Sequence, residues 1–134
     1  MTHQQGPRIG VAVLVRDPEG RLLLGRRGKE PNYGKWVVPG GGIKFGEDWV
    51  VAGERELREE TGLEIEIERN ERPFVWQILS EGEHRIILFA FARVRGGGLH
   101  PASDLLDARF FTRDAIPRAD LSPAIAPVLS ELGW

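Results

Sequence analysis

Three observations in the sequence predict a mixed β-sheet packed between helices, which is an α/β or α+β architecture. The chain has 134 residues, which suits one domain of ordinary size. Short apolar segments recur along it and are typical of strands, whereas only two segments have helical character. Apolar residues make up 41% of the chain and charged residues 28%, so we expect a packed core. We expect a flexible N-terminus over residues 1–8 and one domain over residues 9–134.

Seven segments predict strands, because each is short, rich in apolar residues and bounded by turn residues. They span residues 9–15, 21–26, 36–38, 63–68, 74–79, 85–94 and 107–112. The turn sequence at residues 17–20 should join the first two strands as a hairpin. A basic loop at residues 27–35 separates the second strand from the third.

Two segments predict helices. Residues 47–61 have helical composition, and Gly62 follows them as the residue type best suited to a left-handed helix end. A C-terminal helix should begin at Ser122, a capping residue type, with Pro123 in its first turn. The glycine clusters at residues 40–42 and 96–98 should form loops.

Composition and charge exclude several classes of function. The chain has no cysteine, so disulfides, thiolate metal sites and cysteine nucleophiles are absent, and any metal must bind oxygen or imidazole. The net charge of −2 gives no overall attraction to polyanions, so we expect no nucleic-acid partner, although a local phosphate site is compatible with it. The longest apolar run, residues 86–92, is too short to span a membrane. We therefore expect no membrane partner and a cytoplasmic location.

Three glutamates of the central helix share one face at an energetic cost. Glu56, Glu59 and Glu60 stand at positions i, i+3 and i+4, where like charges repel by a few tenths of a kcal/mol per pair. Glu59 and Glu60 also lie in the last turn, where the helix dipole disfavours negative charge. A divalent cation bound by oxygen ligands would reverse both penalties, and magnesium is common where phosphate is the substrate. The alternative is a solvated acidic face balanced by Arg55.

A longer pattern contains these glutamates and favours the metal hypothesis. Residues 41–63 read Gly-x5-Glu-x7-Arg-Glu-Leu-x-Glu-Glu-x-Gly-Leu. Neither the P-loop pattern nor the dinucleotide-binding glycine pattern occurs in this region. The segment resembles the signature of the Nudix hydrolases at every defined position. The preceding stretches Leu-Leu-Leu-Gly-Arg-Arg and Gly-Lys-Trp-Val-Val-Pro-Gly-Gly are also similar to this family.

The resemblance implies an α/β/α sandwich that hydrolyses the pyrophosphate bond of a nucleoside diphosphate linked to a group X. The short chain and the Leu-Leu-Gly-Arg-Arg strand resemble small nucleoside-triphosphate pyrophosphohydrolases and sugar-nucleotide hydrolases, and our first expectation is a (d)NTP cleaved to the monophosphate and pyrophosphate. Two alternatives are kept: an ADP-ribose or sugar-nucleotide pyrophosphatase, and a Nudix module that senses or binds nucleotides without turnover. The expected partner is a small nucleotide, and the resemblance is compatible with a homodimer.

The resemblance also implies a ligand set for Mg²⁺, with Mn²⁺ as a substitute. The ligands would be the carbonyl of Gly41 and the carboxylates of Glu56, Glu59 and Glu60. Glu47 and Arg55 would orient these carboxylates. Lys44 stands at a position that is often acidic in the family, and it could add a phosphate contact.

The general base is left open between two regions of the chain. Glu56 and Glu59 lie in the signature helix, and Asp104 lies in the loop before the last predicted strand. Asp104 could equally be a residue that caps its own loop.

Substrate phosphates have four candidate contacts. Arg27 is the strongest because it follows a strand and resembles an arginine that the family has near the glycine loop, and a solvated surface arginine is its alternative. The others are Lys35 and the backbone of Gly41 and Gly42.

Overall fold

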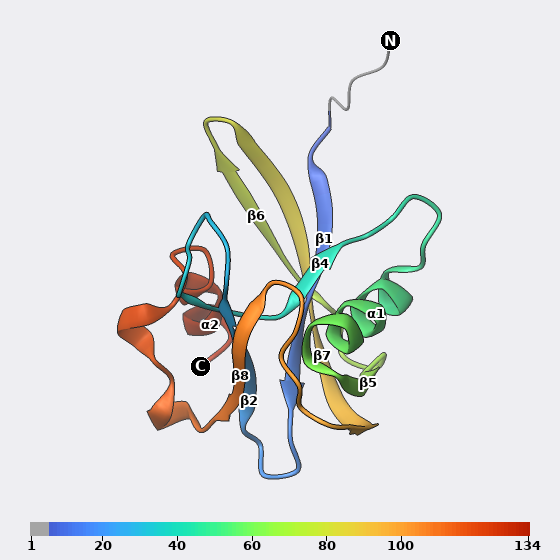
Figure 1. Ribbon diagram of the computed structural model, residues 1–134. Coiled ribbons are helices and arrows are strands. Elements are labelled where there is room, and N and C mark those ends of the chain that lie inside the picture. Colours follow the sequence, from blue (N-terminus) through green and yellow to red (C-terminus); the bar gives the residue numbers. More distant parts are fainter. Residues whose placement is uncertain (1–5) are drawn as a thin grey trace.

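The computed structural model describes residues 6–134, in which eight strands form one mixed sheet (Figure 1). The strands are β1 (Arg8–Arg16), β2 (Leu22–Arg27), β3 (Trp36–Val37), β4 (Gly40–Gly42), β5 (Leu63–Ile67), β6 (Phe74–Ser80), β7 (Glu83–Gly97) and β8 (Leu105–Phe111). The helices are α1 (Trp49–Thr61) and α2 (Ala126–Glu131), with short 3-10 turns at Arg113–Ala115 and Arg118–Asp120. Most of the expected flexible N-terminus, residues 1–5, lies outside the described residues, and β1 begins at Arg8.

Strand β1 organises the sheet. It pairs in parallel with β7 along its whole length, from Arg8 opposite Arg85 to Arg16 opposite Arg93. The predicted hairpin of β1 and β2 exists only at its turn, where Arg16 lies opposite Leu22. Beyond that pair β2 turns away and pairs with β3 and β8. Figure 1 shows β1 and β2 separating from their common turn, and β4 pairs with β1 above it.

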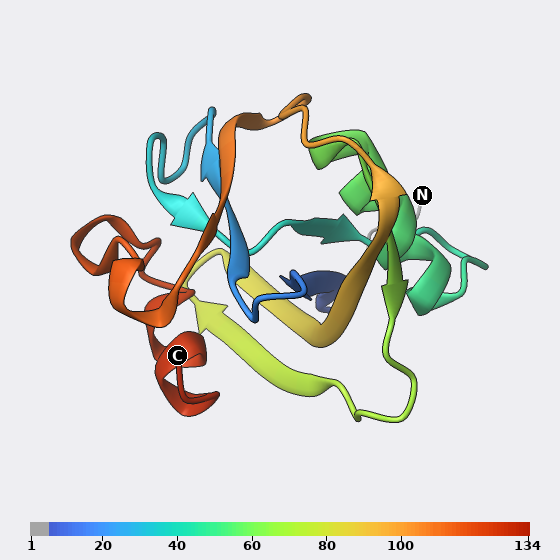
Figure 2. The same cartoon turned by 90° about the horizontal axis from the view of Figure 1, so that it is seen from below.

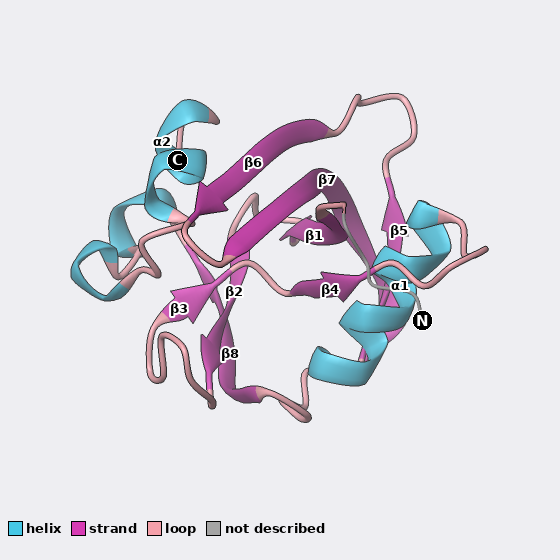
Figure 3. Ribbon diagram, turned by 90° about the horizontal axis from the view of Figure 1, so that it is seen from above, coloured by secondary structure: helices cyan, strands magenta, loops and turns pink. Residues whose placement is uncertain are grey.

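The sheet is covered on both faces, so the expected α/β/α sandwich is confirmed. Side chains of a strand alternate between the two faces of its sheet. On β1, the cluster beneath α1 contains Val11, Val13 and Val15. The opposite cluster contains Ala12 and Leu14 and packs with Val128 and Leu129 of α2. Figure 3 shows the two helices on opposite sides of the sheet.

The prediction that the glycine clusters are loops is wrong for Gly40–Gly42 and for Gly96 and Gly97, whereas Gly98 lies in the loop after β7. Gly40–Gly42 form β4, whose close approach to β1 needs glycine: a Cβ on Gly40 would overlap the carbonyl oxygen of Val11. Gly96 and Gly97 extend β7 and pair with the first residues of β5. Neither cluster has the alternating side-chain pattern by which strands are recognised.

Helix α1 begins two residues later than expected, because Asp48 caps it. The Asp48 side chain accepts hydrogen bonds from the backbone N–H groups of Val50, at 3.1 Å, and Val51, at 3.2 Å. The helix ends where the sequence predicts, since Gly62 is left-handed with φ of 79°.

The start predicted for the C-terminal helix is wrong. Ser122 is buried, and its carbonyl accepts hydrogen bonds from the N–H groups of Ile125 and Ala126, so the residues after it form a turn. Helix α2 starts at Ala126 and has Pro127, not Pro123, in its first turn. Among the described residues, neither helix has the length and apolar character needed to cross a bilayer.

Candidate active site

Strand β4 and helix α1 lie side by side and bring the glycine cluster against the acidic face of the helix (Figures 1 and 3). The carboxylate of Glu56 lies directly over Gly41. A Cβ built on Gly41 would come within 2.5 Å of the Glu56 Oε1 atom. Glycine at this position therefore makes the space that the Glu56 carboxylate occupies.

Arg55 joins three of the glutamates named in the sequence analysis. Its Nη1 donates to Oε1 of Glu56 at 3.0 Å and to Oε1 of Glu59 at 2.9 Å. Its Nε and Nη2 donate to the two carboxylate oxygens of Glu47, at 2.8 and 3.0 Å. Its Nη2 also donates to the carbonyl of Gly42 at 3.3 Å. One guanidinium thus fixes the helix face to the loop before the helix and to β4.

These contacts shift the ionisation of Glu47. Hydrogen bonds from Arg55, and one from the backbone N–H of Lys44, lower the pKa of Glu47 to about 2. The bond to Glu47 is also the largest cause of a raised Arg55 pKa. The pair is therefore fully charged at neutral pH.

Glu60 differs from its neighbours because it is buried, with 8% of its surface exposed. Its Oε1 accepts a hydrogen bond of 3.0 Å from the backbone N–H of Gly40. Burial raises the pKa of Glu60 to about 7, and the negative charges of Glu56 and Asp104 add to the rise, while the Gly40 N–H and Arg27 oppose it. Near neutral pH Glu60 is therefore protonated in part of the molecules, and a bound cation would favour its charged form.

Asp104 is brought to this cluster by the loop that precedes β8. The last carbonyls of α1 accept hydrogen bonds from this loop: Glu60 from the N–H of Ala102 at 2.9 Å, and Thr61 from the N–H of His100 at 2.7 Å. The Asp104 carboxylate pairs with Lys29 Nζ at 2.9 Å. The sequence analysis does not name Lys29, and its place in the basic loop is the signal that could have indicated it.

The two basic residues expected at the phosphates flank the loop between β2 and β3: Arg27 ends β2, and Lys35 is the last residue before β3. Arg27 is half-buried, donates from Nε to the carbonyl of Pro31 at 2.6 Å, and is close enough to affect the Glu60 pKa. Lys35 accepts a backbone hydrogen bond from Arg27 at 2.8 Å and donates one to Asn32 at 3.0 Å. The charge of Arg27 therefore acts on the acidic cluster. Backbone hydrogen bonds fix the position of Lys35.

The donor chemistry of the cluster suits a hard divalent cation, since its acidic side chains offer only carboxylate oxygens. Over residues 6–134, no three His, Cys, Asp or Glu side chains converge tightly enough to form a metal cage by themselves. Arg55 holds Glu56 and Glu59, and Glu60 turns to the Gly40 N–H. To bind a cation, the carboxylates would therefore have to break some of these hydrogen bonds.

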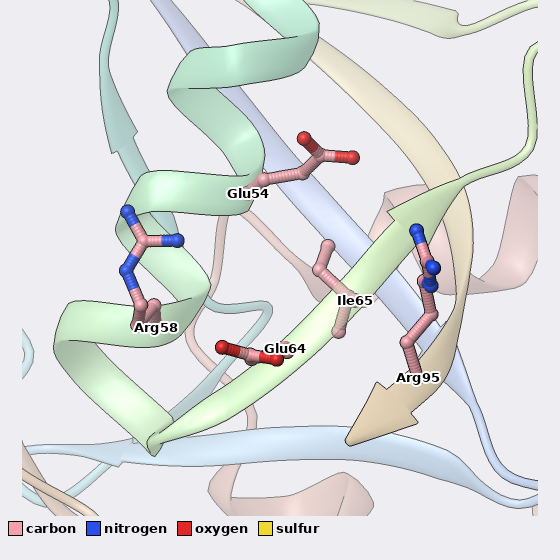
Figure 4. A pocket seen from close by; sticks show the side chains of 5 residues that line it. All are labelled: Glu54, Arg58, Glu64, Ile65 and Arg95. Carbon is pink, nitrogen blue, oxygen red and sulfur yellow. The ribbon is translucent and has the colours of Figure 1, made fainter. Parts of the chain in front are cut away.

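A separate shallow hollow lies on the other side of α1 (Figure 4). It is lined by Glu54, Arg58, Glu64, Ile65 and Arg95. Glu54 and Arg58 project from the helix face opposite to that of Glu56, because residues two positions apart on a helix point in different directions. The hollow is therefore not part of the acidic cluster.

Curated relatives match a limited part of the chain. The m7GpppN-mRNA hydrolase NUDT17 of Xenopus laevis is 47% identical over 64 residues, which cover 46% of this chain and 22% of that protein. The RNA pyrophosphohydrolase of Caulobacter vibrioides (strain NA1000 / CB15N) is 45% identical over 60 residues, which cover 45% of this chain and 34% of that protein. The matched region thus spans about a fifth to a third of these relatives' length.

Solved structures match nearly the whole fold. A MutT NUDIX hydrolase from Burkholderia pseudomallei has a TM-score of 0.81 and 27% identity, covering 96% of this chain and 99% of that chain. A NUDIX hydrolase from Nitrosomonas europaea has a TM-score of 0.78 and 27% identity, covering 89% of this chain and 65% of that chain. The family model described as NUDIX domain matches residues 6–132, and this family generally uses divalent metal ions. The chain therefore belongs to the Nudix family.

Proposed function

We propose that this protein is a metal-dependent hydrolase that cleaves the pyrophosphate bond of a nucleoside diphosphate linked to a group X. The favoured substrate is a (d)NTP, cleaved to the monophosphate and pyrophosphate. The observation that carries the proposal is the cluster of Glu56, Glu59 and Glu60 beside Gly41, with Arg55 bonded to two of the three carboxylates. The similarity to a MutT NUDIX hydrolase along almost its entire length supports it.

In this proposal the cluster holds Mg²⁺, with Mn²⁺ as a substitute. The carboxylates of Glu56, Glu59 and Glu60 and the carbonyl of Gly41 supply oxygen ligands of the kind that Mg²⁺ prefers. When bound, the cation neutralises charge on the phosphate oxygens and lowers the pKa of a water molecule. Arg55 and Glu47 keep two of the carboxylates oriented, and so limit the reorganisation needed for binding.

Asp104 is our choice for the general base. Glu56 and Glu59 each accept a hydrogen bond from Arg55 and are assigned to the metal, whereas Asp104 lies at the edge of the cluster with 42% of its side chain exposed. Proton transfer to Asp104 would require its carboxylate to leave Lys29, and a polyphosphate would attract that lysine.

Phosphate binding is assigned to Arg27, with Lys35 and the backbone of β4 as further contacts. Arg27 is half-buried and already lies within the electrostatic range of Glu60. An arginine placed this way can contact two phosphate oxygens at once. The negative charge of the substrate phosphates would then be neutralised by basic residues on one side and by the bound metal on the other.

A second candidate substrate is the 5′-polyphosphate end of an RNA. β2 ends with Arg26 and Arg27, and the loop after it carries Lys29, Lys35 and Tyr33, which is 56% exposed. Basic residues that follow a backbone and an exposed aromatic ring on which a base can stack are features of single-stranded nucleic-acid sites. The Caulobacter vibrioides and Xenopus laevis relatives are named for RNA substrates. This candidate revises the expectation of no nucleic-acid partner.

Product analysis by chromatography tests the proposal. The panel holds (d)NTPs, ADP-ribose, a sugar nucleotide and a short 5′-triphosphate RNA, each incubated with Mg²⁺ or with chelator. Release of pyrophosphate from a (d)NTP supports the favoured substrate, whereas release from RNA alone supports the second candidate. Formation of AMP and ribose phosphate from ADP-ribose would select the alternative pyrophosphatase. Nucleotide binding without any product would overturn the proposal in favour of a binding module.

A further inference from the structure

Strand β6 is an edge of the sheet that lacks the usual protection. It spans seven residues, FVWQILS, none of them charged, and it pairs with β7 without a shift in register. Among the described residues no strand pairs with its other side. An open edge presents N–H and C=O groups to other strands, and proteins normally block it with charges, proline, a bulge or a short length.

The other edge strands of this sheet all carry such a block. β3 has two residues and β4 consists of three glycines. β5 carries Glu64 and Glu66 and is bulged against β7. β8 carries Asp107 and Arg109 and is bulged against β2. β6 is thus the exception among the edges of the same sheet, which suggests that a strand covers it.

The exposed side chains of β6 agree with this reading. Val75 and Leu79 are 57% and 66% exposed, and they lie on the same face because they are four residues apart. Phe74 and Trp76 point to the other face, where they stack at 5.8 Å and pack against the cluster beneath α2. The strand therefore offers exposed apolar side chains and an unpaired backbone edge together.

We propose that β6 pairs antiparallel with β6 of a second copy of this chain, about a two-fold axis at Gln77. This is the register in which all seven residues find a partner. It places Val75 opposite Leu79 of the other copy on one face, and Trp76 opposite Ile78 on the other face, each twice. No charged residue opposes another within the paired strands.

Charge complementarity just outside the strand favours a second copy over an unrelated partner. Arg72 stands just before β6 and Glu81 directly follows it, so antiparallel pairing brings Arg72 of one copy towards Glu81 of the other at the ends of the paired strands. Arg72 and Glu81 are both exposed, whereas Glu83 is already paired with Arg85 at 3.3 Å. Glu71 is already bonded to Arg16 at 2.8 Å, so its charge is compensated. The symmetry makes this attraction occur at both ends of the interface.

The proposed interface leaves the acidic cluster accessible. Figures 1 and 3 show β1 and β7 between β6 and α1. The pairing would join two sheets into one continuous sheet, the mode of recognition known as β-augmentation. It does not depend on the proposed hydrolase activity.

Cysteine crosslinking tests the register, because the chain has no cysteine of its own. Directly opposite residues of an antiparallel pair have Cα atoms about 4.5–5.5 Å apart, within the range that a disulfide spans. Gln77→Cys should therefore form a covalent dimer under mild oxidation. Ser80→Cys is the matched control, since six residues would separate it from its own copy along the strand, about 20 Å.

Sedimentation equilibrium of the unmodified chain and two variants gives the second readout. We expect a reversible dimer for the natural sequence, a monomer for Leu79→Lys, and a dimer for Val51→Lys, which changes an exposed apolar residue on α1. A monomer at every concentration, or equal crosslinking of Gln77→Cys and Ser80→Cys, would overturn the proposal. Faster crosslinking of Val75→Cys than of Gln77→Cys would overturn the register.

Discussion

Arg55 donates two parallel hydrogen bonds to the carboxylate of Glu47, from Nε at 2.8 Å and from Nη2 at 3.0 Å. Glu47 lies in the loop just before α1 and Arg55 lies in the middle of the helix, so their pairing fixes how the loop approaches the helix. The remaining nitrogen, Nη1, is thereby directed at Glu56 and Glu59. The orientation of both carboxylates depends on a residue outside the helix.

Gly41→Ala should reduce hydrolysis while leaving the fold intact. The added methyl group would come within 2.5 Å of the Glu56 carboxylate, which is the end of a flexible side chain and can move away. We expect activity to fall roughly 10- to 100-fold, the range seen when the orientation of metal ligands is disturbed. Steady-state rates and thermal unfolding measure the two effects. Gly42→Ala is the structural control, because a Cβ there meets nothing within 4 Å; an equal loss in both variants would contradict this account.

Arg55→Lys should weaken the response to Mg²⁺, because an ammonium group cannot hold Glu47 with two bonds and contact Glu56 and Glu59 as well. We expect the Mg²⁺ concentration at half-maximal rate to rise by roughly 10- to 100-fold. Titration of the rate with Mg²⁺ measures it. Arg58→Lys, on the opposite face of the same helix, should behave like the natural sequence, and a similar shift there would refute the role of Arg55.

The low pKa of Glu47 gives a pH-dependent contribution to stability with a defined sign. The folded-state pKa is about 2, below the ordinary value of 4.5, so the Glu47 charge stabilises the fold at pH values above its unfolded pKa. This stabilisation is lost as the pH falls from about 4.5 towards 2. Urea unfolding in the presence of chelator measures the free energy of unfolding of the natural chain and of Glu47→Gln. The difference between the two should stay constant from neutral pH down to about pH 4.5 and shrink below it. A difference that grows on acidification would contradict the ion pair.

Asp104→Asn should lower kcat without changing the dependence on Mg²⁺, if Asp104 is the base. Removal of a general base typically costs about 10²- to 10⁴-fold in rate. Single-turnover rates at saturating Mg²⁺ measure the loss. Lys29→Met removes the ion pair of 2.9 Å but leaves the carboxylate, so its effect should be smaller. A loss below tenfold in Asp104→Asn would return the role to Glu56 or Glu59.

The sequence predicts the acidic helix well, because periodicity and a terminal glycine are local signals. The shared face of Glu56, Glu59 and Glu60 and the helix end at Gly62 follow from residue spacing. The strand of three glycines could not be recognised, since strands are found by their side-chain pattern. The predicted start of the C-terminal helix is wrong because the pair Ser-Pro is a signal for a turn as well as for a helix.

Contacts between distant segments are the part of the site that sequence reasoning could not supply. Lys29 and Asp104 meet because β8 pairs with β2 and because the preceding loop bonds to the end of α1. The burial of Glu60, which raises its pKa, likewise depends on β4 lying beside the helix. Neither position has a local pattern that indicates its partner.

The most direct test of the metal-dependent hydrolase is a Mg²⁺ titration of hydrolysis for the natural chain and for Glu59→Gln. This substitution removes one charge with almost no change in shape, and Glu59 is 48% exposed, so folding should be unaffected. The account predicts a saturable rate that disappears in chelator for the natural chain, and nearly no rate at any Mg²⁺ concentration for the folded variant. Hydrolysis in chelator, or near-normal turnover by Glu59→Gln, would contradict it.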